Sequence, residues 1–171
     1  VLKDIIDSKS STNKYDKDWF ASNSGEYPIF TGSQDIAAYI YPKDENDIIN
    51  KTSLSYNKDN DKGSKVFFHN KPYIIGGHHY SLFIKEDLQS TISIKYLYYI
   101  LMEHFNKVQY FQSQLPVANI GIIEKINISI PNNIDSDNSL LKISSIQLQR
   151  AIAKYIEEKM KRIEEQNNTI D

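Results

Sequence analysis

The stretch SKVFFHNKPYIIGGHHYSLFI, residues 64–84, decides the fold of this chain. It holds three short apolar runs separated by turn-forming residues: 64–69, 73–75 and 78–84, with Asn70-Lys71-Pro72 and Gly76-Gly77 between them. Short runs that are rich in β-branched and aromatic residues and bounded by Gly, Pro and Asn are typical of β-strands. Strands this close together in sequence predict a curved, mostly antiparallel sheet.

The chain before this stretch repeats the pattern more sparsely. Tyr27-Pro28-Ile29-Phe30 predicts a short strand, and residues 31–35 predict the turn after it. A second apolar run follows at 36–41. Residues 43–63 are polar and charged, with their clearest turn at 59–63, and no strand is predicted within them.

Helical spacing appears after the strand-rich stretch. Ser93 is a suitable N-cap for a helix from Ile94 to about Val108. The apolar residues of this helix recur at spacings of three and four: Ile94, Leu97, Tyr98, Leu101 and Phe105. Asn119 predicts the cap of a short helical turn that runs to 123–125. Residues 126–130 alternate between Ile and polar residues, which predicts a half-buried strand.

The C-terminal segment predicts a long amphipathic helix that starts at about Leu140 or Ile146 and ends near Glu165. Its apolar positions form one stripe: Leu148, Ile152, Ile156, Met160 and Ile163. Such a stripe must be buried against another surface, and both a partner helix and the chain's own domain are open as that surface. We expect an α+β fold with a domain at 1–131, a linker at 132–139 and a docking helix at 140–171.

Composition limits the classes of protein that fit. Hydrophobic residues make up 40% of the chain, which is enough for a core, and the formal net charge is −2. Because the chain is not basic, any nucleic-acid surface must be a local positive patch. There is no cysteine, and no apolar run is long enough to span a bilayer. We therefore expect a cytoplasmic protein that needs no membrane.

Catalytic and metal-binding patterns are weak. The histidines His69, His78, His79 and His104 form no His-Glu-x-x-His motif, and neighbouring residues on a strand point to opposite faces. Neither a nucleophile elbow nor a phosphate-binding loop is present. The sequence indicates a protein without catalytic residues, metal or cofactor of its own.

Seven motifs occur in an order that resembles a known family: residues 25–32, 63–68, 73–79, 94–101, 114–120, 126–131 and 149–156. Among them are Tyr27-Pro28-Ile29-Phe30, the helix start Tyr96-Leu97-Tyr98-Tyr99 and the strand end Ile128-Ser129-Ile130-Pro131. This order is similar to the target-recognition domain of the specificity (S) subunit of type I restriction-modification systems. It also resembles the related domain of type IIG enzymes, which is fused to an adenine-N6 methyltransferase. In the family the helix follows Ile-Pro directly, whereas here residues 132–147 intervene, so the subtype stays open.

The resemblance implies a non-catalytic domain that recognises a double-stranded DNA sequence and positions a methyltransferase and a restriction nuclease on it. Polar and cationic side chains on loops beside the sheet are then the candidate DNA contacts, because base edges and phosphates are recognised by such groups. The candidates are Thr31, Ser33, Gln34, Lys65, His69, Lys71, His78, His79, Gln112, Ser113, Gln114 and Asn119.

Each candidate has an ordinary structural interpretation as well. Thr31, Ser33 and Gln34 also suit a self-contained turn, and Asn119 also suits a helix cap. An alternative function uses only the long helix, as a protein-interaction module that docks a partner or a second copy without recognising DNA. The two functions differ in one measurement, because only DNA recognition predicts duplex binding that weakens steeply with salt.

Overall fold

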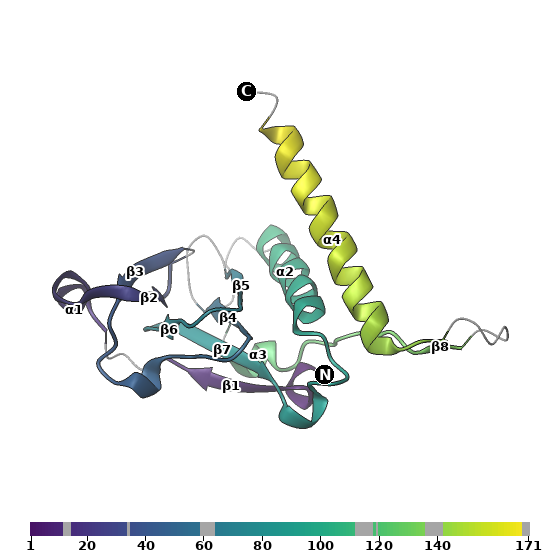
Figure 1. Cartoon of the computed structure of the whole chain (residues 1–171), viewed down its shortest axis with the longest axis horizontal. Coiled ribbons are helices and arrows are strands. Elements are labelled where there is room, and N and C mark those ends of the chain that lie inside the picture. Colours follow the sequence, from purple (N-terminus) through teal and green to yellow (C-terminus); the bar gives the residue numbers. More distant parts are fainter. Residues whose placement is uncertain are drawn as a thin grey trace.

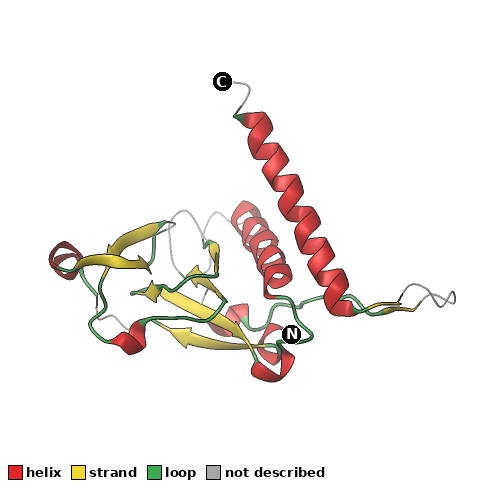
Figure 2. Ribbon diagram, in the orientation of Figure 1, coloured by secondary structure: helices red, strands yellow, loops and turns green. Residues whose placement is uncertain are grey.

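The structure is a computed structural model that describes residues 1–11, 15–33, 35–58, 64–111, 118, 120–135 and 142–168. It confirms an α+β fold. A four-stranded and a three-stranded sheet lie side by side, and the long helices lie to one side of them (Figures 1 and 2). Among the described residues, no helix is both long enough and apolar enough to cross a bilayer.

The larger sheet has four strands in the order β1-β7-β4-β5, all antiparallel. Two of its strands come from the stretch quoted first, and these confirm the strand predictions at 64–69 and 78–84. The other two were not predicted from the sequence. The strands are β1 (Ile6–Ser10), β4 (Ser53–Asn57), β5 (Val66–His69) and β7 (His79–Ile84).

Strand β4 lies between β5 and β7, inside the segment for which no strand was predicted. Its polar composition hides a strict alternation, in which Leu54 and Tyr56 face one core while Ser53 and Ser55 face other buried groups. All five residues of the strand are buried. The serines are tolerated there because each has a hydrogen-bond partner.

The smaller sheet has three strands in the order β3-β2-β6, with β2 antiparallel to β3 and parallel to β6. Gly25 lies at an irregularity in the pairing of β2 with β3, and a Cβ built there would lie 2.4 Å from the backbone nitrogen of Tyr41, the residue after β3. Only glycine permits this approach. The strands are β2 (Ser24–Phe30), β3 (Ile36–Ile40) and β6 (Ile74–Ile75), and a short helix α1 (Lys17–Ser22) packs beside them.

Helix α2 (Ile94–Phe111) covers the apolar face of the larger sheet. Tyr56 of β4 stacks on Tyr80 of β7 and packs against Phe105 of α2, with ring centroids 5.5 and 5.6 Å apart. The predicted N-cap is confirmed, because the Ser93 hydroxyl accepts a hydrogen bond from the Tyr96 amide at 3.4 Å. This helix and the sheet enclose the main hydrophobic core.

The predicted strand at 126–130 is wrong. These residues follow α3 (Ile120–Ile123) and form no strand with any residue that the structure describes. Their alternation is nevertheless real, because Ile126, Ile128 and Ile130 pack against the main core while the polar residues between them are exposed. The alternation therefore indicates that one side of the segment is buried, and an extended segment without a pairing strand shows the same alternation.

The long helix α4 (Ser145–Asn167) begins with a capping box formed by Ser144 and Gln147. Two-residue strands pair just before it, β8 (Ile134–Asp135) and β9 (Lys142–Ile143). The first half of α4 packs on α2, where Gln149 and Ala153 are buried. The second half projects away from the rest of the chain (Figure 1).

Candidate nucleic-acid interface

One end of the larger sheet gathers several turns of the chain. There β7 begins beside the end of β4, because Asn57 pairs with His79, and the start of β5 pairs with the same strand through Tyr56 and Val66. The Lys58 amide donates to the carbonyl of His78 at 3.0 Å. The exposed and half-buried residues at this end are called the loop surface: Thr31, Ser33, Asp35, Lys58, Lys65 and His78.

The turn between β2 and β3 is tied to this end of the sheet by side chains of the larger sheet. The carbonyl of Gly32 accepts from the Asn57 amide at 3.3 Å, and the carbonyl of Thr31 accepts from His79 Nδ1 at 2.8 Å. Lys65 Nζ lies 3.6 Å from the Asp35 carboxylate. The structure thus brings together two separate groups of predicted contacts, the 31–35 turn and Lys65 with His78.

A chain of hydrogen bonds runs beneath the loop surface. A carbonyl can only accept, so Nδ1 of His79 is protonated and donates the hydrogen bond to the Thr31 carbonyl. Nε2 of His79 is then unprotonated and accepts a hydrogen bond from the Ser55 hydroxyl at 2.8 Å. The Ser55 oxygen in turn accepts from His69 Nε2 at 2.6 Å. Every donor in this chain faces an acceptor when both rings are neutral.

Burial keeps both rings neutral. The pKa of His69 is lowered to about 3, mainly because the ring is removed from water and also because a protonated His79 nearby would repel a second positive charge. Removal from water also lowers the pKa of His79 to about 4, although the Thr31 carbonyl favours its protonated form. Phe30 packs against both rings, and His69 stacks on Tyr73 at 3.6 Å between ring centroids.

The predicted DNA contacts of His69 and His79 are corrected by this arrangement. Their residues are 7% and 1% exposed, so neither ring can reach a duplex. His78, in contrast, is exposed and has a positive φ of 64°. His78 lies in the turn before β7, whereas His79 is the first residue of that strand, so the two neighbouring histidines have different environments.

The other candidates divide by position. The Ser33 hydroxyl donates to the Asp35 carbonyl at 2.6 Å, as in a self-contained turn. Lys71 follows β5, at the far end of that strand from Lys65. Five candidates lie outside the described residues: Gln34, Gln112, Ser113, Gln114 and Asn119. The amide of Ala118 donates a hydrogen bond to the Lys58 carbonyl at 2.7 Å, which places Ala118 at the loop surface.

Sequence reasoning missed Asn57 and Lys58, because the segment 43–63 carried no strand prediction. The alternation Ser53-Leu54-Ser55-Tyr56 was the signal that could have revealed β4 and hence its polar end. Asn57 is fully buried, and besides holding Gly32 its side-chain oxygen accepts from the Lys65 amide at 2.7 Å. It therefore joins the 31–35 turn to the start of β5.

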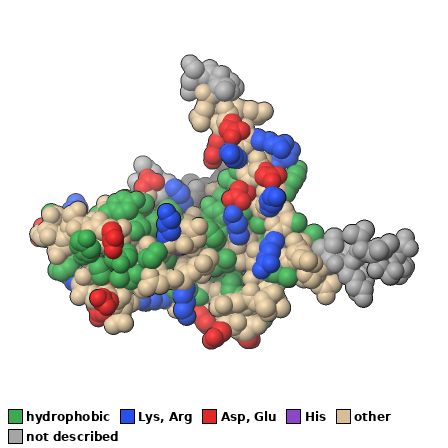
Figure 3. Space-filling view, in the orientation of Figure 1, with side chains coloured by type: hydrophobic (Ala, Val, Ile, Leu, Met, Phe, Trp, Pro, Cys, Tyr) green, Lys and Arg blue, Asp and Glu red, His purple; other side chains and the backbone are tan. Residues whose placement is uncertain are grey.

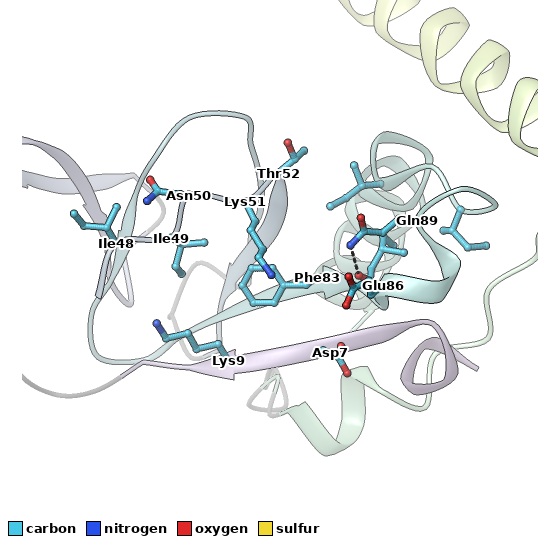
Figure 4. Close-up of a pocket in the computed structure, with 13 residues that line it drawn as sticks. Asp7, Lys9, Ile48, Ile49, Asn50, Lys51, Thr52, Phe83, Glu86 and Gln89 are labelled. Carbon is cyan, nitrogen blue, oxygen red and sulfur yellow. Dashed lines mark hydrogen bonds between the residues drawn. The ribbon is translucent and has the colours of Figure 1, made fainter. Parts of the chain in front are cut away.

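A groove of about 940 Å³ lies elsewhere, between β1 and the segment that precedes β4 (Figure 4). Its charged lining is balanced, with Lys9 and Lys51 against Asp7 and Glu86. Lys9 also donates to the Asn46 carbonyl at 3.2 Å. A balanced groove is poorly suited to a polyanion. Among the described residues, no cluster of His, Asp and Glu side chains could hold a metal ion.

Charge on the visible face is dispersed rather than gathered. Basic and acidic side chains alternate along α4 (Figure 3). The ion pairs of this helix include Lys154 with Glu158 and Lys161 with Glu165, and Glu157 pairs with Lys95 of α2 at 2.7 Å. The long helix is thus a solvated, charge-balanced element outside its apolar stripe.

Comparison with solved structures shows the same fold in longer proteins. The S subunit of the type I restriction-modification system from M. genitalium is 17% identical, with a TM-score of 0.65 over 96% of this chain and 39% of that one. The HsdS subunit from Thermoanaerobacter tengcongensis is 12% identical, with a TM-score of 0.66 over 98% of this chain and 38% of that one. A structure described for complex assembly and conformational transition of the type I R-M system is 11% identical, with a TM-score of 0.67 over 98% and 39%.

The chain therefore spans about two fifths of the length of these relatives. A search of curated proteins found no match. The model of one family, described as the type I restriction modification DNA specificity domain, matches residues 1–170. Because that match covers all but the last residue, the chain belongs to the type I restriction-modification DNA specificity domain family.

Proposed function

We propose that this chain recognises a double-stranded DNA sequence through its loop surface and, as a non-catalytic specificity element, positions a methyltransferase and a restriction nuclease on that DNA. The observation that carries the proposal is the meeting of the 31–35 turn, Lys58, Lys65 and His78 at one end of a rigid sheet. Family membership supports the same function.

The chemistry of the loop surface suits a duplex. Lys58 and Lys65 supply positive charge at the loop surface, which Asp35 beside Lys65 offsets only in part, and a chain of net charge −2 requires such a local patch to bind a duplex. Thr31, Ser33 and His78 supply short polar groups of the kind that contact phosphates and base edges. The predicted contacts Gln34, Gln112, Ser113, Gln114 and Asn119 remain part of this proposal, with the two glutamines 112 and 114 suited to adenine.

A titration of the full chain with short duplexes at several salt concentrations tests the proposal. Affinity should fall steeply as salt rises, since lysines that neutralise phosphates release counterions. Lys65→Ala should weaken binding to all sequences alike and reduce the salt slope by about one. A wild-type chain that binds no duplex, or binds it independently of salt, would contradict the proposal.

Lys71→Ala is the matched comparison, because it removes the same charge at the other end of β5. A smaller loss of affinity than for Lys65→Ala would confine the DNA to the loop surface. An equal loss would extend the contact along β5 and include Lys71, as the sequence predicted.

We further propose that α4 is the element that docks the catalytic partner or a second copy. Its stripe Leu148, Ile152, Ile156 and Met160 is only half-buried by the domain, and Ile163 near its far end is 56% exposed. Apolar side chains on a projecting helix are stabilised by a partner surface. This observation also favours the second candidate function, a docking module without DNA recognition, which the salt titration separates from the first.

A further inference from the structure

The turn at 31–33 carries side chains of the loop surface, yet its backbone is held from inside the molecule. His79, 1% exposed, donates to the Thr31 carbonyl, and Asn57, fully buried, donates to the Gly32 carbonyl. Gly76 also contacts the start of the turn, since its amide donates to the Phe30 carbonyl at 2.7 Å. A Cβ at Gly76 would lie 2.9 Å from Cγ2 of Thr31.

His79 is itself fixed on its other side. The Ser55 hydroxyl donates to its Nε2, and Ser55 is in turn bonded to His69, which stacks on Tyr73. Tyr73 bonds to Ser53 and donates to Ser81 at 2.9 Å. The imidazole of His79 is thus the last member of a satisfied buried network that begins in the middle of the larger sheet. Such networks restrict their members to one arrangement.

We propose that His79 is a positioning residue for sequence recognition: from the interior of the sheet it fixes the backbone of the 31–33 turn and thereby the groups that the turn presents to DNA. This inference rests on the proposed function. Hydrogen bonds to base edges weaken steeply with small changes of distance and angle. If the turn lost this one of its internal anchors, the loop surface would still attract the duplex through its lysines but would distinguish sequences less well.

Two near-isosteric variants separate the two ends of the ring. His79→Asn keeps an amide donor near the place of Nδ1, for the Thr31 carbonyl, and loses the contact with Ser55. His79→Gln keeps an amide near the place of Nε2, for Ser55, and loses the donor to Thr31. Each variant loses one buried hydrogen bond, so a purely structural role predicts equal effects on stability and on DNA recognition.

The probe is a pool of short duplexes with a randomised central segment, and sequencing of the bound fraction measures enrichment by the full chain. Wild type and His79→Asn should enrich the same sequence. His79→Gln should lose about 3- to 10-fold of that enrichment, the equivalent of one hydrogen bond, while its affinity for an unrelated duplex stays unchanged. Equal enrichment in all three proteins, or equal loss in both variants, would overturn the inference.

Amide hydrogen exchange tests the positioning without DNA. Exchange at Gly32 and Ser33 should be faster in His79→Gln than in His79→Asn, and identical rates would overturn the inference even if DNA binding is intact. If wild type itself enriches no sequence, the proposed function fails and this inference fails with it. If the wild type enriches a sequence and the two variants cannot be distinguished from each other, the inference is refuted while the proposed function stands.

Discussion

At the scale of residues, the two buried histidines link stability to pH. Their pKa values of about 3 and 4 lie below the value of about 6.5 for an exposed histidine. Between pH 6.5 and these lower pKa values, the unfolded chain binds protons that the native chain does not. The contribution of the two histidines to the free energy of unfolding is therefore greatest above pH 6.5 and decreases as the pH falls toward 4 and 3.

We expect urea unfolding to show a loss on the order of 1 kcal/mol for each histidine per pH unit between pH 6 and 4. His69→Gln should make this dependence shallower, because one proton-binding site of the unfolded chain is gone. His78→Asn is the control, since His78 is exposed and its left-handed backbone suits Asn. A slope that His69→Gln leaves unchanged would contradict the neutral buried pair.

Tyr56 offers a second prediction at this scale. Its hydroxyl is buried and makes no hydrogen bond with any residue that the structure describes. Burial also raises its pKa far above the usual range. Tyr56→Phe should therefore leave the free energy of unfolding unchanged or raise it by up to about 1 kcal/mol, measured in urea. Tyr80→Phe, whose ring is half-buried beside it, is the comparison, and a clear loss in Tyr56→Phe would show an essential hydroxyl.

At the scale of elements, the smaller sheet depends on one close approach. Gly25→Ala would place a methyl group 2.4 Å from the Tyr41 nitrogen and 2.5 Å from the Ile40 carbonyl carbon, so β3 would have to move. We expect a loss of about 1 to 3 kcal/mol in chemical unfolding. Ser24→Ala, at the exposed neighbouring residue, should change stability far less, and equal effects of the two variants would refute the packing argument.

An aspartate should have different effects on the two faces of α4, because one face packs against α2 and the other carries the exposed part of the apolar stripe. Ala153 is 1% exposed against α2, so Ala153→Asp should detach the helix and lower the thermal midpoint. Ile163→Asp, together with Ile156→Asp, should spare the fold of 1–131 and weaken assembly with a partner instead. Circular dichroism and size-exclusion chromatography measure the two effects, and unfolding by the Ile163 and Ile156 variants would place this stripe in the domain's own core.

At the scale of the whole molecule, sequence patterns predicted the elements that depend on residues close together in the chain. The strands at 27–30 and 78–84, the helix at Ile94 and its Ser93 cap depend on neighbouring residues, and all were predictable. Partners distant in sequence were not, because Thr31 and His79 are 48 residues apart. The sequence therefore predicts these histidines as surface groups, because no local pattern distinguishes a buried, hydrogen-bonded imidazole from an exposed one.

The double character of β4 has a consequence for how the molecule assembles. Leu54 and Tyr56 contact one environment and Ser53 and Ser55 the other, and side chains alternate strictly along a strand. If β4 slipped by a single position against its neighbours, its serine hydroxyls would enter the apolar core, and its apolar side chains would face the buried imidazoles. His79 would then lose the hydroxyl that donates to its Nε2, and His69 would lose the oxygen that accepts from its Nε2. A chain with the shifted register would therefore lose both apolar packing and buried hydrogen bonds, so the alternation along β4 selects the native register.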